Sequence, residues 1–121
     1  MNAKQLVGHL FTARNVAHST HLNTRSFSKH MALNTFYDEI VELADRFAEA
    51  YMGRTRKLIG VIPLMPVEKA GSIIEFLVWS LDVIEKNRYD VVSKDDTALQ
   101  NIIDEIVALY LSTLYKLEEL A

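Results

Sequence analysis

The chain has 121 residues, of which 50% are hydrophobic and 24% are charged, and its formal net charge is −3. This length allows one domain with a real hydrophobic core and is too short for two ordinary ones, so we expect a single domain over residues 1–121. The absence of cysteine excludes disulfides, thiolate chemistry and a zinc site built on sulfur. The acidic balance, without a basic cluster, argues against a nucleic acid as partner.

Targeting and membrane signals are also missing from the sequence. The N-terminal residues lack the apolar core of a signal peptide. The longest apolar-rich run, residues 73–84, contains Glu75, Ser80 and Asp82, and it is far shorter than the roughly 20 residues that span a bilayer. We therefore expect a cytoplasmic protein with no membrane partner.

The first predicted helix covers about Ala3 to Leu22. Its apolar residues recur at helical spacing and form one stripe, as expected for a helix that packs on a core. The stripe consists of Leu6, Leu10, Ala13 and Ala17. Gly8 lies inside this helix and weakens it by about 1 kcal/mol relative to alanine.

A second helix is predicted after a turn at Asn23 and Thr24. Either Thr24 or Ser26 caps it, because short hydroxyl side chains accept hydrogen bonds from the free N–H groups of a first turn. The helix runs to about Met52, and Gly53 favours a stop there. Its core stripe consists of Leu33, Phe36, Ile40, Leu43, Phe47 and Tyr51.

Residues 54–65 are predicted to form an apolar loop that packs across the helices, since Gly60 and Pro63 interrupt any strand there. Pro66 suits the first turn of a third helix, which runs to about Lys86. This helix is apolar almost all round, which is typical of a helix that is buried or covered by a partner chain.

The last helix is predicted to follow a loop over residues 87–94. Ser93 with Asp96 three positions later resembles a capping box, and the helical pattern continues to about Glu119. Four helices joined by short and medium connections predict an all-α fold, an antiparallel four-helix bundle.

Four side chains of kinds that commonly bind metals lie in the first two helices: His18, His30, Asp45 and Glu49. Fifteen helical residues span about 22 Å, so His30 and Asp45 of one chain do not reach the same ion. A shared site therefore needs two antiparallel copies, which gives a twofold dimer with two equivalent sites. Imidazoles and carboxylates with open positions suit iron(II) and also admit zinc or manganese. His18 and His30 lie at similar distances on either side of the turn, so an antiparallel hairpin places their imidazoles at similar heights, where they can converge. His21, one turn from His18, joins or replaces it in this hypothesis.

The spacing His-x11-His-x14-Asp-x3-Glu resembles that of the Dps proteins, which are ferritin-like DNA-protecting proteins of starved cells. Phe27, the FYDEI stretch and ADRFAEAYMG add to the resemblance, which covers about residues 15–53. It implies a ferritin-like bundle, a homo-oligomer, and an iron centre shared between subunits that oxidises iron(II) with oxygen or peroxide. It assigns the ligand roles to His18, His30, Asp45 and Glu49.

The chain departs from this family at several positions. Ser19 stands where the family has tryptophan, Ala50 stands where it has arginine, and the glycine of the turn is absent. The connector is too short and too apolar for the helix that the family uses at its dimer interface, and no basic tail is present to hold DNA. These departures put the twelve-subunit cage and DNA binding in doubt more than the bundle.

Other interpretations stay open. Taken singly, each histidine is more often a surface or hydrogen-bonded residue than a ligand. The apolar third helix and connector favour a structural or interaction subunit without catalysis, because both need to be covered. The segments from Arg14 to His21 and from Arg25 to His30 also fit the loose Arg-x6-His and Arg-x4-His patterns of HEPN ribonucleases, but the acidic balance argues against RNA.

Overall fold

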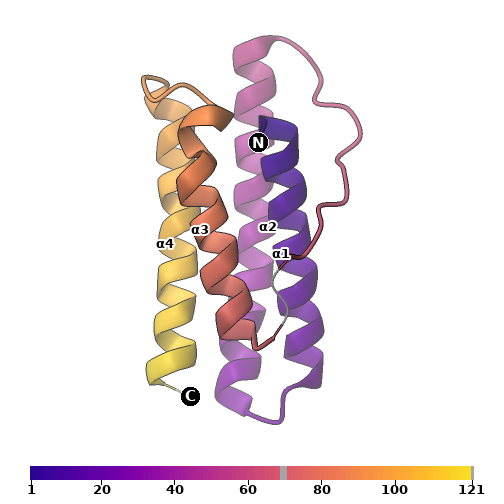
Figure 1. The fold of residues 1–121 in the computed structure, drawn as a ribbon, viewed down its shortest axis with the longest axis vertical. Helices are drawn as coiled ribbons and strands as arrows, with labels where there is room; N and C mark the ends of the chain where they lie inside the picture. Colours follow the sequence, from indigo (N-terminus) through magenta and orange to yellow (C-terminus); the bar gives the residue numbers. More distant parts are fainter. Residues whose placement is uncertain (69–70, 121) are drawn as a thin grey trace.

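The computed structural model describes residues 1–68 and 71–120, and the regular secondary structure in these residues is helical (Figure 1). The four helices are α1 (Ala3–Asn23), α2 (Phe27–Thr55), α3 (Ile73–Val91) and α4 (Thr97–Glu119). No strand occurs in these residues, so the prediction of an all-α fold with four helices is confirmed.

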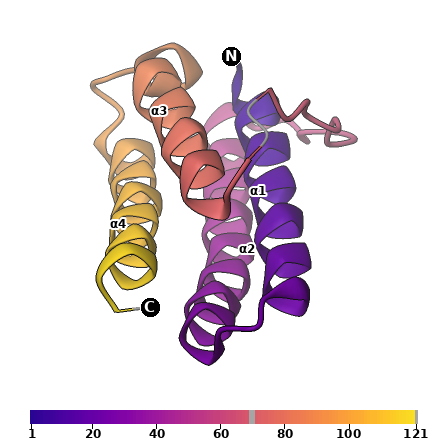
Figure 2. The same ribbon diagram turned by 60° about the horizontal axis from the view of Figure 1, so that its bottom comes forward.

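The helices pack side by side, each against two neighbours. In Figure 1, α1 runs down, α2 runs up beside it, a long connection returns to the bottom, α3 runs up, and α4 runs down. The contacting pairs are α1 with α2, α2 with α4, α4 with α3, and α3 with α1, so every contacting pair is antiparallel. Seen from nearer the end of the helices, α3 lies between α4 and α1 (Figure 2).

A single core lies along the centre of this packing. The predicted stripe of α1 is buried, and so are Leu33, Phe36, Ile40 and Phe47 of the stripe of α2, whereas Leu43 and Tyr51 are half-buried. From α3 and α4 the largest contributions are fully buried side chains: Leu77, Ile84, Leu99, Ile103, Ile106 and Tyr110. The helical periodicity of the sequence therefore predicted the core faces well.

Each helix begins at a side-chain oxygen that accepts a hydrogen bond from the backbone of its first turn. These caps are Asn2, Ser26, Ser72 and Asp96. Such caps satisfy backbone N–H groups that have no partner within a helix. Of the two candidates for the cap of α2, Ser26 and Thr24, the structure shows Ser26. The predicted capping role of Ser93 in the last helix is wrong, because Asp96 is the cap.

The predicted end of α2 at Met52 is wrong, because the helix continues through Gly53 to Thr55. Arg56 then ends it in the left-handed conformation, with φ of 59°, and its N–H donates to the Met52 carbonyl. The last turn is held from outside, since the Arg54 guanidinium makes two hydrogen bonds of 2.9 and 3.1 Å to the Asp96 carboxylate. A contact with the start of another helix thus overrides the local stop signal.

The third helix begins later and ends later than predicted. It starts at Ile73, not Pro66, and part of the predicted start, residues 69–70, lies outside the described residues. It also runs through most of the predicted loop to Val91. Gln100 of α4 explains this extension, because its Nε2 donates to the carbonyls of Arg88 and Val92 at 3.0 and 3.1 Å and so satisfies the end of α3.

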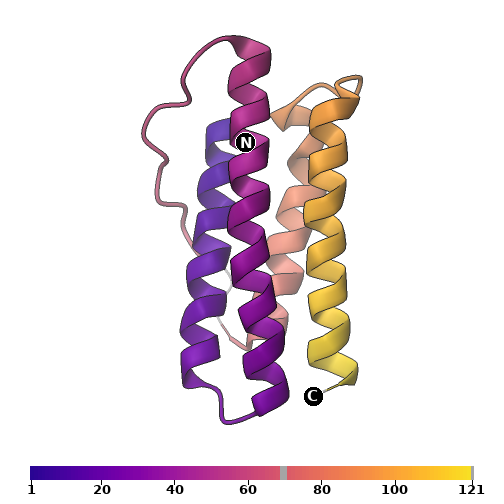
Figure 3. The same ribbon diagram turned by 180° about the vertical axis from the view of Figure 1, so that it is seen from behind.

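The long connection between α2 and α3 contains a segment that we call the crossover strap, residues 57–68. It runs down the outer side of α1, as Figures 1 and 3 show from opposite sides. Gly8 of α1 makes this course possible, because a Cβ there would collide with the Pro63 carbonyl oxygen. The Thr12 hydroxyl adds a long hydrogen bond of 3.4 Å to the Met65 carbonyl.

Candidate functional site

The histidines of the predicted metal site join α1 to α2 within one chain. The His21 Nδ1 lies 2.7 Å from the His30 carbonyl, and the His30 Nδ1 lies 2.9 Å from the His21 carbonyl. Their rings stack with centroids 3.6 Å apart. Because a carbonyl only accepts hydrogen bonds, each Nδ1 carries the hydrogen and donates it. We call this reciprocal pair the histidine clamp, and it closes the α1–α2 turn.

The third candidate histidine, His18, packs on an aromatic side chain. Its ring stacks on Tyr37 of α2 with centroids 4.3 Å apart, and its centroid lies 6.0 Å from that of His21. The Arg14 guanidinium lies over the same Tyr37 ring, 5.3 Å from its centroid. His18, His21 and His30 therefore gather at the closed end of the hairpin, as the sequence predicted.

The carboxylates of the predicted metal site lie elsewhere. Asp45 and Glu49 are exposed and sit farther along α2, beyond the reach of His30 by the length of the helix. Among residues 1–68 and 71–120, no three histidine or carboxylate side chains come together in a way that could hold a metal ion. The four predicted ligands thus do not fit one ion within a single chain.

A buried polar network at the centre of the molecule was missed by the sequence analysis. The His9 Nε2–H donates to the Ser80 carbonyl at 3.0 Å and lies 2.8 Å from the Ser80 Oγ, which is 2.7 Å from the Tyr110 hydroxyl. All three residues are buried. Burial lowers the pKa of His9 despite the opposing hydrogen bond to Ser80, and it raises the pKa of Tyr110. The network therefore holds a neutral imidazole and a neutral phenol.

The helical spacing of the sequence contained a signal for this network. His9 follows Leu6 by three positions, and Ser80 follows Leu77 by three, so both side chains fall on core faces. A polar residue on a core face needs a partner when it is buried. Which helices supply the partners depends on how α1, α3 and α4 pack, and this was not accessible from the sequence.

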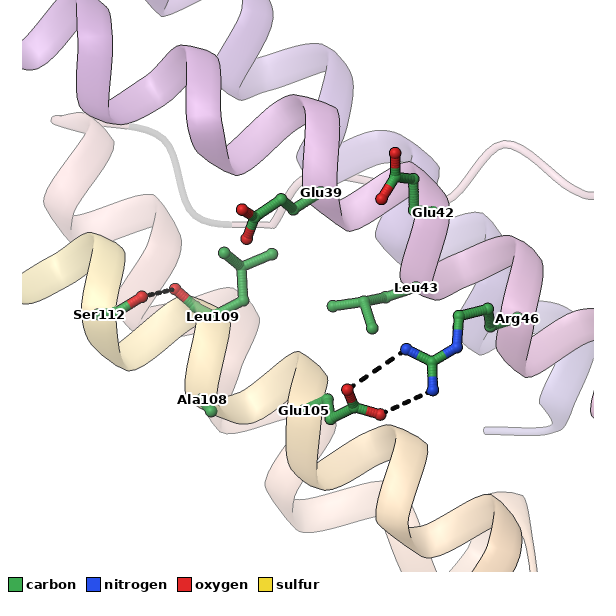
Figure 4. A pocket seen from close by; sticks show the side chains of 8 residues that line it. All are labelled: Glu39, Glu42, Leu43, Arg46, Glu105, Ala108, Leu109 and Ser112. Carbon is green, nitrogen blue, oxygen red and sulfur yellow. Dashed lines mark hydrogen bonds and ion pairs between the residues drawn. The ribbon is translucent and has the colours of Figure 1, made fainter.

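An open groove of about 530 Å³ lies between α2 and α4 (Figure 4). The Arg46 guanidinium spans it with two hydrogen bonds of 2.9 and 3.3 Å to the Glu105 carboxylate. Glu39 and Glu42 line its rim, and Leu43 lies between them and the ion pair. Because both partners of the ion pair are about half exposed, the pair adds little to stability.

The crossover strap exposes aliphatic side chains at every third position. Leu58, Val61 and Leu64 are 90%, 89% and 96% exposed, and Val67 is 45% exposed. We call these four residues the aliphatic ridge. Of the residues between them, Gly60 and Pro66 are exposed, whereas four face inward and are half-buried, namely Ile59, Ile62, Pro63 and Met65. The strap thus holds its underside on the protein and presents an apolar row to solvent.

A second groove, of about 450 Å³, adjoins the upper end of the ridge. Leu58 and Ile59 line it together with Tyr51 of α2, and its basic side chains are Lys4 and Lys57. We call it the lysine groove. It joins the start of α1, the end of α2 and the start of the strap, so one site combines apolar surface with positive charge.

In the part of the chain that the structure describes, no helix is both long enough and apolar enough to cross a bilayer.

Comparison with known proteins gives one family and one curated relative. The model of a family of unknown function, DUF5856, matches residues 21–117. An "uncharacterized 14.6 kDa protein in mobD-ri intergenic region" of Enterobacteria phage T4 is 28% identical over 116 residues, which cover 95% of this chain and 87% of the relative. No solved structure matches.

These findings correct the resemblance to the Dps proteins. That resemblance was carried by a short spacing pattern, whereas the match to another family extends over most of the chain. The identification as a Dps-like protein is therefore wrong. The chain belongs to the family of unknown function DUF5856.

Proposed function

We propose that this protein acts as an interaction subunit that binds another protein through the aliphatic ridge. The observation that carries the proposal is the near-complete exposure of Leu58, Val61 and Leu64 in one row. Single exposed apolar residues are ordinary on protein surfaces, but a contiguous row marks a surface that another molecule covers.

The packing of the strap on α1 supports the same function. Its inward-facing residues are half-buried, and Gly8 admits the Pro63 carbonyl so closely that no larger residue fits without a shift. A surface that is already ordered loses less conformational entropy on binding than a mobile loop. The ridge is therefore suited to bind as a preformed edge.

Site-specific photo-crosslinking in producing cells tests this function. A photoreactive amino acid at Val61 is expected to give a protein adduct, and the same amino acid at Glu85, an exposed residue of α3, is expected to give none. Leu64→Asp should abolish the Val61 adduct, because it places a charge in the ridge. Equal adducts at the two positions, or no effect of Leu64→Asp, would contradict the proposal.

Three finer predictions accompany this function. A homo-oligomer follows if a second copy covers the ridge. A cytoplasmic location is supported by the absence of cysteine, which fits a reducing compartment. The ferritin-like description of the fold is supported by connectivity. One long crossover joins two helices that run in the same direction, as in ferritin-like bundles.

Iron binding and iron(II) oxidation remain a second proposal. It is supported by the histidine clamp, because donation from each Nδ1 leaves the Nε2 of His21 and His30 free to accept. It needs a second chain whose Asp45 and Glu49 approach the histidine end. Metal analysis of protein purified without a chelator or a histidine tag tests it, and a preparation free of iron that also fails to take up added iron(II) would exclude it.

A further inference from the structure

We propose that the occupant of the aliphatic ridge is a second copy of this chain, lying antiparallel across a twofold axis. In this arrangement the two ridges pack on each other. The Val67–Glu68 end of each strap enters the lysine groove of the other chain. The proposal rests on the proposed function, because it names the partner of the same surface.

The ridge carries no charge, so it is compatible with a second copy of itself. The segment from Leu58 to Val67 contains no charged residue, so two copies pack it without burying an unpaired charge. In a twofold contact the same patch serves both chains, which requires a surface that is compatible with itself. A row of leucine and valine side chains meets this requirement.

The charges at the ends of the strap favour the antiparallel direction. Arg56 and Lys57 precede the ridge, and Glu68 follows it. Antiparallel packing places each Glu68 beside the basic end of the other chain, whereas parallel packing places the basic ends together. Lys69 comes next in the sequence and lies outside the described residues. Glu68 is therefore the residue that we expect to contact the basic end of the other chain.

The lysine groove gives the acidic end a place to bind. Its wall next to the strap is formed by Leu58 and Ile59, at the opposite end of the ridge from Glu68. Lys4 reaches over the strap, because its Nζ lies 3.3 Å from the point where a Cβ on Gly60 would be. A valine followed by a carboxylate therefore meets apolar walls first and then two ammonium groups.

The size of the ridge predicts a weak dimer. Ten extended residues span roughly 30 Å, and a row about 10 Å wide then covers roughly 300 Å² on each chain. Stable complexes bury about 800 Å² on each partner, so we expect an equilibrium between monomer and dimer that depends on concentration.

Sedimentation equilibrium over a wide range of protein concentration tests the contact. The mass of the wild-type chain should rise from that of the monomer toward that of the dimer. Leu64→Asp should raise the dissociation constant by more than about tenfold, because each change is present twice in a twofold contact. Leu111→Asp is the matched control, since Leu111 is 53% exposed on α4, a helix that does not contact α1, and its dimer should match wild type.

Charge exchange tests the direction. Lys57→Glu alone and Glu68→Lys alone should each weaken the dimer by about fivefold, and the double variant should recover the wild-type constant. Recovery supports the antiparallel contact between these residues. Failure to recover, with each single change harmful, would overturn the proposed register.

Two further outcomes would overturn the proposal. A wild-type chain that stays monomeric at every concentration excludes the second copy, and a dimer that is lost with Leu111→Asp and kept with Leu64→Asp excludes the ridge as the contact. A monomeric chain that still gives a Val61 adduct with a different protein refutes this inference and leaves the proposed function standing. The absence of any specific adduct refutes both.

Discussion

Three polar side chains at the centre of the molecule, His9, Ser80 and Tyr110, join α1, α3 and α4. Leucine and isoleucine faces can slide on one another at small cost, but these three groups satisfy each other in one arrangement only. A shift of α3 along α1 would leave a buried donor or acceptor without a partner, at a cost of about 1–3 kcal/mol. The network therefore fixes the position of a helix whose surface is otherwise largely apolar.

The buried imidazole of His9 predicts a loss of stability in acid. Burial lowers its pKa below the ordinary value of 6.5, so below pH 6.5 the unfolded chain binds a proton that the folded chain does not. The free energy of unfolding then falls as the pH decreases, by at most about 1.4 kcal/mol per pH unit from this group. The contribution is fully present above pH 6.5 and is lost as the pH falls toward the lowered pKa.

Replacing His9 with glutamine isolates this effect. The amide still donates a hydrogen bond but does not titrate, so His9→Gln should show a smaller decrease in unfolding free energy between pH 7.5 and about 5.5 than wild type. Urea unfolding at several pH values measures it, and the other three histidines are present in both proteins. Parallel pH profiles for the two proteins would contradict the assignment.

At the scale of the helices, two glycines with the same local cost have different surroundings. Gly8 and Gly53 each lie inside a helix, where glycine costs about 1 kcal/mol relative to alanine. A Cβ on Gly53 would meet nothing within 4 Å, whereas one on Gly8 would collide with the Pro63 carbonyl of the strap. Helix propensity alone therefore predicts the sign of the change in unfolding free energy for a glycine-to-alanine substitution at Gly53, but not at Gly8.

The same substitution at these two glycines should have opposite effects. Gly53→Ala is expected to raise the free energy of unfolding by about 0.5–1 kcal/mol. Gly8→Ala is expected to lower it by about 1–3 kcal/mol, because the strap has to move away from α1. Urea unfolding of both variants at neutral pH measures the difference. Stabilisation by both would show that the strap does not press on α1.

The helix faces were predictable from the sequence, and the helix ends were not. The apolar stripes repeat within each helix, so a local pattern is enough to assign them. The end of α2 depends on Arg54 bound to Asp96, and the end of α3 depends on Gln100 bound to the Arg88 carbonyl. Both contacts form only when two helices pack against each other, so a local pattern does not contain them. Local signals such as Gly53 therefore predicted helix ends that differ from the observed ones.

At the scale of the whole molecule, the predicted site shows how a short pattern misleads. The spacing of His18, His30, Asp45 and Glu49 suggested one family, and the match over residues 21–117 gives another. The gathering of the histidines was nevertheless predicted, because two helices joined by a tight turn place equidistant residues at similar heights. Their reciprocal bonds to carbonyls were not predicted, since they depend on ring orientation.

The proposed self-association through the aliphatic ridge also predicts that thermal stability depends on protein concentration. A partner that binds only the folded chain stabilises it by mass action, by about 1.4 kcal/mol when its concentration is tenfold above the dissociation constant. For a domain of about 100 residues this corresponds to a rise in Tm of roughly 5 °C. Scanning calorimetry of the wild-type chain should therefore show Tm increasing with protein concentration. Over the range in which the wild-type Tm rises, Leu64→Asp should show a much smaller rise, while Leu111→Asp should keep the full rise. A rise in Leu64→Asp as large as that of wild type would place the contact on another surface.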